Sequence, residues 1–132
     1  SQIPQNRTHF IYVLNNIDTP SFVHGDLHLG NVLWNDGHIV GIIDFESCKF
    51  LDSLYDFVKL KLWVFDEYSQ YYSDFLEGYS NTNKLPDDMD ERLDIYMGVE
   101  YLYFIEYFGH KYYQEDMLTR YQNKIKQWSE EV

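Results

Sequence analysis

Three polar side chains at fixed spacing have the chemistry for phosphoryl transfer. Asp26 lies in the sequence His24-Gly25-Asp26-Leu27-His28-Leu29-Gly30-Asn31, and Asp44 follows thirteen residues after Asn31, at the end of an apolar run. A carboxylate such as Asp26 can orient an attacking hydroxyl group and accept its proton. An amide oxygen and a second carboxylate are hard ligands that suit Mg²⁺. The spacing therefore predicts phosphate transfer from ATP or GTP, with Asp26 as catalytic base and Asn31 and Asp44 as magnesium ligands.

A β-hairpin is expected to bring the two magnesium ligands together. Residues 32–34 and 39–43 are β-rich apolar runs, and Asn35-Asp36-Gly37-His38 lies between them. Asn and Gly tolerate positive φ, so this sequence favours a tight turn. The hairpin, at about residues 31–44, would place Asn31 and Asp44 at the same end, where they can share one metal ion.

Helices are expected on both sides of this region. Residues 8–15 have the pattern of a helix end, and Asp52 or Ser53 can cap a helix whose buried face includes Leu54, Phe57 and Val58. Further helices are predicted over about residues 66–79 and 89–108, followed by a last amphipathic helix. The later half of the 89–108 helix is apolar nearly all round, which is typical of a buried helix.

The same residues resemble the aminoglycoside phosphotransferase and choline kinase family, the small-molecule relatives of protein kinases. The resemblance rests on His24-Gly25-Asp26, Asn31-Val32-Leu33, Ile43-Asp44-Phe45 and Asp56-Phe57, and it covers about residues 22–61. It implies an α+β, mostly helical fold. The chain would be the C-terminal lobe of a protein-kinase-like fold, with a small catalytic β-hairpin followed by several α-helices.

The resemblance also implies roles for neighbouring residues. His24 would hydrogen-bond the backbone and hold Asp26 in place, and Asp56 would accept hydrogen bonds from the loop as well as starting a helix. Glu46, next to Asp44-Phe45, is a candidate contact for an ammonium group of the substrate. Glu100 and Glu106 lie on the apolar helix predicted over residues 89–108, where a carboxylate is costly unless it is paired. They would contact ammonium groups of the substrate or form ion pairs with Lys or Arg.

The net charge, the apolar runs and the cysteine count limit which partners and which cellular setting the sequence predicts. The net charge of −12 argues against nucleic acid and anionic membranes as partners. Residues 66–116 hold thirteen Asp and Glu against three Lys and Arg, so this segment is either a solvated helical surface or one that attracts a cationic substrate. No apolar run approaches the roughly 20 residues of a membrane helix. The single cysteine, Cys48, favours a reducing, cytoplasmic setting.

The length of 132 residues predicts one domain. It would comprise a helix end and linker (1–20), the catalytic loop and metal-binding hairpin (21–61) and a helical substrate-binding part (62–132). The resemblance implies that a complete enzyme also has an amino-terminal nucleotide lobe, whose Gly-rich loop and lysine strand do not precede His24. We therefore expect that lobe to be a missing partner, and this chain alone to be inactive.

Three functions are open at this point. The first is ATP-dependent phosphorylation, with Mg²⁺, of a hydroxyl on a small cationic molecule. That molecule would be an aminoglycoside-like antibiotic, as in antibiotic resistance, or choline, ethanolamine or another amino alcohol. The second is a non-catalytic kinase-like remnant or binding domain. The third is a metal-dependent hydrolase with His24, Asp26 and His28 as ligands, which would leave Asn31 and Asp44 without a role.

Overall fold

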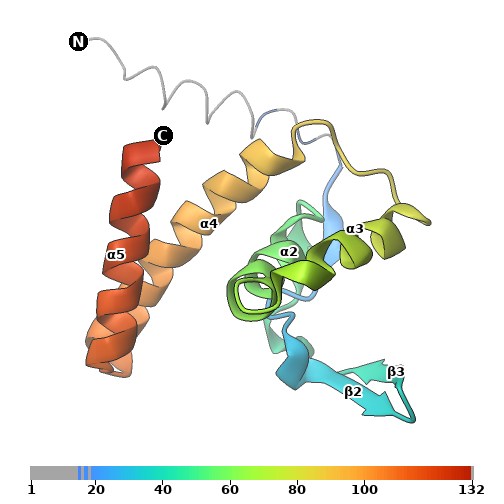
Figure 1. Ribbon diagram of the computed structural model, residues 1–132, viewed down its shortest axis with the longest axis horizontal. Coiled ribbons are helices and arrows are strands. Elements are labelled where there is room, and N and C mark those ends of the chain that lie inside the picture. The colour runs from blue at the N-terminus through green and yellow to red at the C-terminus, as the bar shows by residue number, and fades with distance from the viewer. Residues whose placement is uncertain (1–14, 16, 18, 132) are drawn as a thin grey trace. The chain divides into compact units, whose positions relative to one another are not determined.

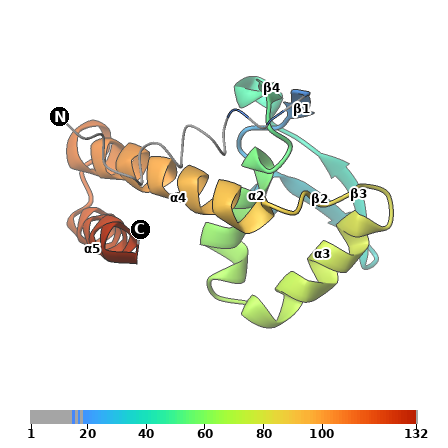
Figure 2. The same cartoon turned by 90° about the horizontal axis from the view of Figure 1, so that it is seen from above.

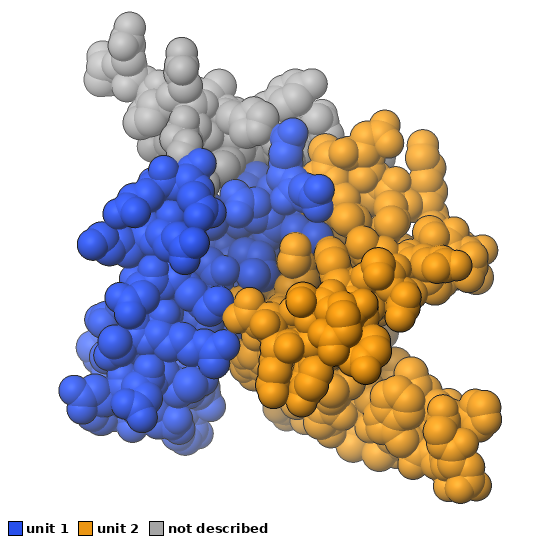
Figure 3. All heavy atoms as spheres, viewed as in Figure 1, with its two compact units in different colours: residues 1–16, 90–132 blue, residues 17–89 orange. Residues whose placement is uncertain are grey.

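The computed structural model describes residues 15, 17 and 19–131 (Figure 1). The chain divides into two compact units, which Figure 3 colours separately. Unit 1 comprises residues 1–16 and 90–132, and unit 2 comprises residues 17–89. The predicted helix end at residues 8–15 lies outside the described residues except for its last position. The described part is mostly helical with small antiparallel sheets, as the sequence predicts.

The predicted hairpin is confirmed in unit 2. Strands β2 (Val32–Asn35) and β3 (His38–Ile42) are antiparallel, as Figure 1 shows, with Asn35 opposite His38. The two turn residues, Asp36 and Gly37, have φ of 50° and 79°. Positive φ at both central positions characterises a type I′ turn, whose twist matches that of the paired strands, and glycine adopts this conformation without strain.

A second sheet joins segments that are far apart in the sequence. Strand β1 (Ser21–Val23) pairs antiparallel with β4 (Lys49–Leu51), and Figure 2 shows the two strands side by side. His24 follows β1 directly, and helix α2 (Tyr55–Leu60) follows β4 after a short turn. The sheet therefore sets the loop of residues 24–31, called the 24–31 loop below, beside the start of α2.

Helix α2 supplies much of the core of unit 2. Leu54, Phe57 and Val58 are only 0%, 3% and 2% exposed, as their spacing predicts. The side chain of Asp52 accepts a hydrogen bond from the Leu54 N–H at 3.0 Å and so stabilises the turn that leads into the helix. Beyond α2 the backbone continues as a π-helical turn, Lys61–Phe65.

Helix α3 (Tyr72–Ser80) packs on α2 through aromatic rings. The Phe57 ring lies 5.1 Å from that of Phe75 and 4.9 Å from that of Tyr79, both edge to face. The prediction that this helix begins near residue 66 is wrong. The N–H of Asp66 bonds to the Lys61 carbonyl at 2.8 Å, so residue 66 completes the preceding helical turn and cannot open a new one.

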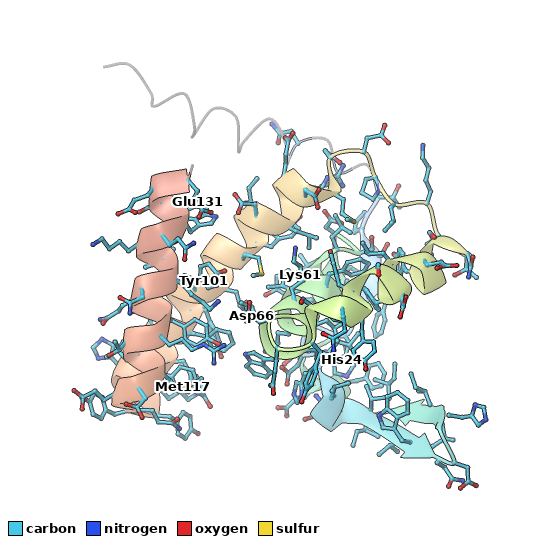
Figure 4. The ribbon with its side chains drawn as sticks, viewed as in Figure 1. His24, Lys61, Asp66, Tyr101, Met117 and Glu131 are labelled. Carbon is cyan, nitrogen blue, oxygen red and sulfur yellow. The ribbon has the colours of Figure 1, made fainter. Side chains whose placement is uncertain are left out.

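Helices α4 (Met89–Glu106) and α5 (Glu115–Glu131) of unit 1 contact each other through aromatic rings. Helix α4, whose first residue is assigned to unit 2, is followed by a π-helical turn and then by α5. The Tyr121 ring of α5 is 1% exposed and lies 4.7 Å from Phe104 and 6.3 Å from Tyr101 of α4. Figure 4 labels Tyr101 on its helix.

The prediction that the later half of α4 is buried all round is wrong. Val99, Leu102 and Tyr103 are 55%, 58% and 50% exposed. The rings of α5 contact the side of α4 that carries Tyr101 and Phe104, and one neighbouring helix covers only the stripe that faces it.

Within the described residues, no helix combines the length and apolarity needed to cross a membrane.

Candidate active site

The 24–31 loop is anchored to α2 by the carboxylate of Asp56. The backbone N–H of His24 donates to Oδ2 and that of Gly25 donates to Oδ1, each at 2.8 Å. Hydrogen bonds to a charged acceptor are stronger than neutral ones, and here one side chain satisfies two successive donors. Asp56 lies in the first turn of α2, so the helix determines where the loop lies.

The imidazole ring of His24 contacts backbone groups on two sides and so restrains the 24–31 loop. Its side chain is buried, and the imidazole Nε2 lies 2.7 Å from the carbonyl oxygen of Ile43. The other ring nitrogen, Nδ1, accepts a hydrogen bond from the Asp26 N–H at 3.2 Å. A carbonyl can only accept, so the proton belongs on Nε2. The ring thus links the loop, next to Asp26, to the residue that follows β3 (His24 is labelled in Figure 4).

These contacts weaken the hydrolase hypothesis. Both ring nitrogens of His24 are engaged by backbone groups, which leaves no lone pair for a zinc ion. Among the residues that the structure describes, no group of three or more His, Cys, Asp and Glu side chains is placed to hold a metal ion. A magnesium site of two protein ligands remains compatible with this finding, because Mg²⁺ keeps several waters and binds phosphate oxygens.

Gly25 allows the loop to run against the backbone of Ser47. Its φ is +81°, and a Cβ atom at this position would lie 2.3 Å from the Ser47 carbonyl oxygen. The positive φ disfavours a side chain here, and the close approach to Ser47 excludes one unless the backbone shifts. The sequence marks this glycine as part of a motif, and the contact with Ser47 is the physical reason for it.

The carboxylate of Asp26 lies between two basic side chains. Lys59 Nζ donates to Oδ1 at 2.5 Å, and His28 Nε2 lies 3.7 Å from Oδ2. The Asp26 side chain is 28% exposed, so it remains accessible to a substrate. Lys59 was not among the site residues predicted from the sequence. Its signal was the spacing from Asp56, because residues three apart on a helix lie on the same face.

Asn31 and Asp44 lie at the same end of the hairpin, as expected. The N–H of Ile43 donates to the Asn31 carbonyl at 3.0 Å and so extends the strand pairing by one residue. The buried Asn31 side chain donates from Nδ2 to the Asp26 carbonyl at 2.9 Å, and its Oδ1 is the atom suited to a cation. Asp44 is exposed and has φ 64° and ψ 61°.

This conformation of Asp44 is uncommon for a residue with a side chain. Left-handed backbone at a non-glycine position costs about 1–3 kcal/mol and tends to occur at functional sites. The two groups together offer an amide oxygen and a carboxylate, which is a donor set that fits Mg²⁺. The donor chemistry and the shared position at the hairpin end are thus both compatible with the predicted magnesium site.

The three predicted substrate glutamates lie in different surroundings. Glu46 is exposed in the 3-10 turn Phe45–Ser47, directly after Asp44. Glu100 is buried and Glu106 is exposed, and both belong to α4 in unit 1. Their part in substrate binding stays a prediction.

Comparison with known proteins gives one result. A family model described as a phosphotransferase enzyme family matches residues 8–94. The matched range includes the 24–31 loop, the hairpin and α2. No curated protein and no solved structure matches the chain.

Proposed function

Because the chain belongs to the phosphotransferase enzyme family, we propose that it forms part of an enzyme that transfers the γ-phosphate of ATP or GTP to a hydroxyl group of a small molecule. We further propose that it folds as the C-terminal lobe of a protein-kinase-like enzyme. The observation that carries the proposal is the position of Asp26. Its accessible carboxylate stands on a loop that Asp56 and His24 hold in place.

In the proposed reaction Asp26 orients the acceptor hydroxyl and accepts its proton. The hydroxyl oxygen forms a bond to the γ-phosphorus while the bond from that phosphorus to the β–γ bridging oxygen breaks, and the nucleoside diphosphate leaves. Asn31 and Asp44 would hold Mg²⁺, which neutralises charge on the phosphates when it is bound. His24 and Asp56 keep the base at a fixed position, since positioning supplies much of the rate in phosphoryl transfer.

We propose a small cationic acceptor, either an aminoglycoside-like antibiotic or an amino alcohol such as choline or ethanolamine. The supporting observation is the charge of the chain, which is −12 in total and concentrated in residues 66–116. The candidate partners of the acceptor's ammonium groups are Glu46, Glu100 and Glu106. A field of this sign raises the local concentration of cations.

Mass spectrometry of candidate acceptors tests the proposal. The full-length protein is incubated with Mg²⁺, ATP or GTP, and a panel of aminoglycosides and amino alcohols, and an acceptor should gain the mass of one phosphate. Asp26→Asn should lower turnover by roughly 10²–10⁴-fold, because it removes the general base. Asp36→Asn is the matched control, since Asp36 lies in the hairpin turn and Asn tolerates its φ of 50°.

The outcomes separate the proposal from its alternative. Transfer that is lost in Asp26→Asn and kept in Asp36→Asn, with circular dichroism unchanged in both, supports a phosphotransferase. Equal turnover in wild type and Asp26→Asn would remove Asp26 from the mechanism. A full-length protein that phosphorylates no acceptor would favour a non-catalytic binding domain.

A further inference from the structure

We propose that Lys59 is a positioning residue for Asp26: its ammonium group holds Oδ1 of the carboxylate and leaves Oδ2 for the acceptor hydroxyl. This inference rests on the proposed function, in which Asp26 is the base. It adds a residue that neither the motif nor the family match assigns.

The two oxygens of Asp26 have different surroundings. Oδ1 accepts a hydrogen bond from Lys59 Nζ at 2.5 Å, whereas Oδ2 faces His28, whose Nε2 lies 3.7 Å away. A separation of 3.7 Å is too long for a hydrogen bond. The contact with Lys59 restricts rotation of the carboxylate, and it assigns proton transfer to Oδ2.

The ammonium group of Lys59 is itself restrained. Its Nζ lies 5.3 Å from the centre of the Trp63 ring, and the Lys59 side chain is only 18% exposed. The same ring contacts His28 edge to face at 5.1 Å. A lysine held between an aromatic face and a carboxylate has lost most of its rotamer freedom in the folded state. It can therefore act as a fixed support for Asp26.

A positioning role predicts which kinetic constant changes. Without Lys59 the carboxylate can rotate away from the hydroxyl, which lowers the rate of the chemical step. Misplacement of a reacting group by about 1 Å can lower a rate by roughly 10²-fold. We therefore expect an effect on kcat rather than on the KM of either substrate.

Two lysine variants of the full-length protein test this expectation. Lys59→Met removes the charge and keeps the length of the side chain. Lys61→Met is the matched control, because Lys61 also lies over an aromatic ring, that of Tyr72, at 5.0 Å. We expect kcat to fall about 10–100-fold in Lys59→Met with each KM within about threefold, and to stay within about twofold in Lys61→Met. Lys59→Arg should restore part of kcat because it restores a charged donor.

A double variant shows whether Lys59 acts through Asp26. Asp26→Asn combined with Lys59→Met should be as slow as Asp26→Asn alone, because a support has no effect once the base is gone. If the fall in turnover of the double variant equals the product of the falls in the two single variants, the inference is overturned, and Lys59 has a role separate from Asp26. If thermal unfolding shows that Lys59→Met does not fold, Lys59→Gln, which keeps a neutral donor, replaces it in both measurements.

The inference and the proposed function fail in different ways. An active wild type together with full turnover in Lys59→Met overturns the role of Lys59 and leaves the phosphotransferase intact. A wild-type protein that transfers phosphate to no acceptor overturns the proposed function, and the role of Lys59 with it. A fall in kcat for Lys61→Met equal to that for Lys59→Met also overturns the inference, because it points to a general loss of packing.

Discussion

Replacing Asp56 with Ala should release the 24–31 loop from α2 and lower the free energy of unfolding. The carboxylate accepts hydrogen bonds from the backbone of His24 and of Gly25, each at 2.8 Å. A hydrogen bond to a charged group contributes about 1.5–3 kcal/mol. Both bonds are only partly buried, so water replaces part of what is lost and the lower figure applies. Two bonds then give a loss of about 3 kcal/mol.

Asp74 provides the matched control for this variant. Asp56 and Asp74 both lie in the first turn of a helix, but Asp74 is exposed on α3. A carboxylate near a helix N-terminus contributes about 0.3–1 kcal/mol through the helix dipole. Asp74→Ala should lose only this amount, so the difference between the variants isolates the hydrogen bonds to the loop. The loss of stability in Asp56→Asn should lie between those of the two alanine variants. The amide oxygen of Asn can accept one of the two hydrogen bonds, whereas its NH₂ group would face the other backbone N–H.

Chemical denaturation of the full-length protein and hydrogen exchange provide the two measurements. Denaturation followed by circular dichroism gives the free energy of unfolding, and exchange reports the His24 and Gly25 amides directly. Both amides should exchange faster in Asp56→Ala than in Asp74→Ala. If the two variants lose the same stability and these amides keep their protection, the carboxylate of Asp56 is not what holds the loop, and the prediction is wrong.

Two further predictions concern glycines and can be tested by thermal denaturation. Gly25→Ala should destabilise the protein more than Gly37→Ala, because a Cβ at Gly25 would lie 2.3 Å from the Ser47 carbonyl oxygen whereas nothing lies within 4 Å of a Cβ at Gly37. Positive φ alone costs about 1–2 kcal/mol at either position. Equal losses of stability in the two variants would contradict the contact with Ser47. Gly98→Ala should lower stability by about 1–3 kcal/mol, since its Cβ would lie 2.6 Å from Cζ2 of Trp128. Trp128→Leu in the same chain should recover part of that loss, and no recovery would contradict the clash.

Features determined by local chemistry were predictable from the sequence. The hairpin follows from the Asp36-Gly37 turn between apolar runs, and its register places Asn31 and Asp44 at one end. The buried face of α2 follows from helical spacing in the same way. The start of α3 was not predictable, because the polar residues after Phe65 fit a new helix as well as the end of the old one.

Features that depend on distant partners were not predictable. The pair of Asp26 and Lys59 joins residues 33 positions apart, and it forms only after the sheet of β1 and β4 has set the 24–31 loop beside α2. The exposure of Val99 on α4 has a similar cause. An apolar pattern indicates that a surface tends to be buried, but it does not say which neighbour, if any, covers it.

Two side chains of α2, those of Asp56 and Lys59, connect the 24–31 loop to the core of unit 2. Asp56 holds the loop backbone and Lys59, one turn later, holds the carboxylate of Asp26. The spacing of these contacts is fixed by the helix, whose own position depends on the buried side chains of Leu54 and Phe57. A shift of α2 would therefore move Asp26, the proposed base, and its backbone support together. In the proposed enzyme, packing defects beneath α2 should lower turnover before they unfold the chain, because positioning tolerates a smaller displacement than folding does.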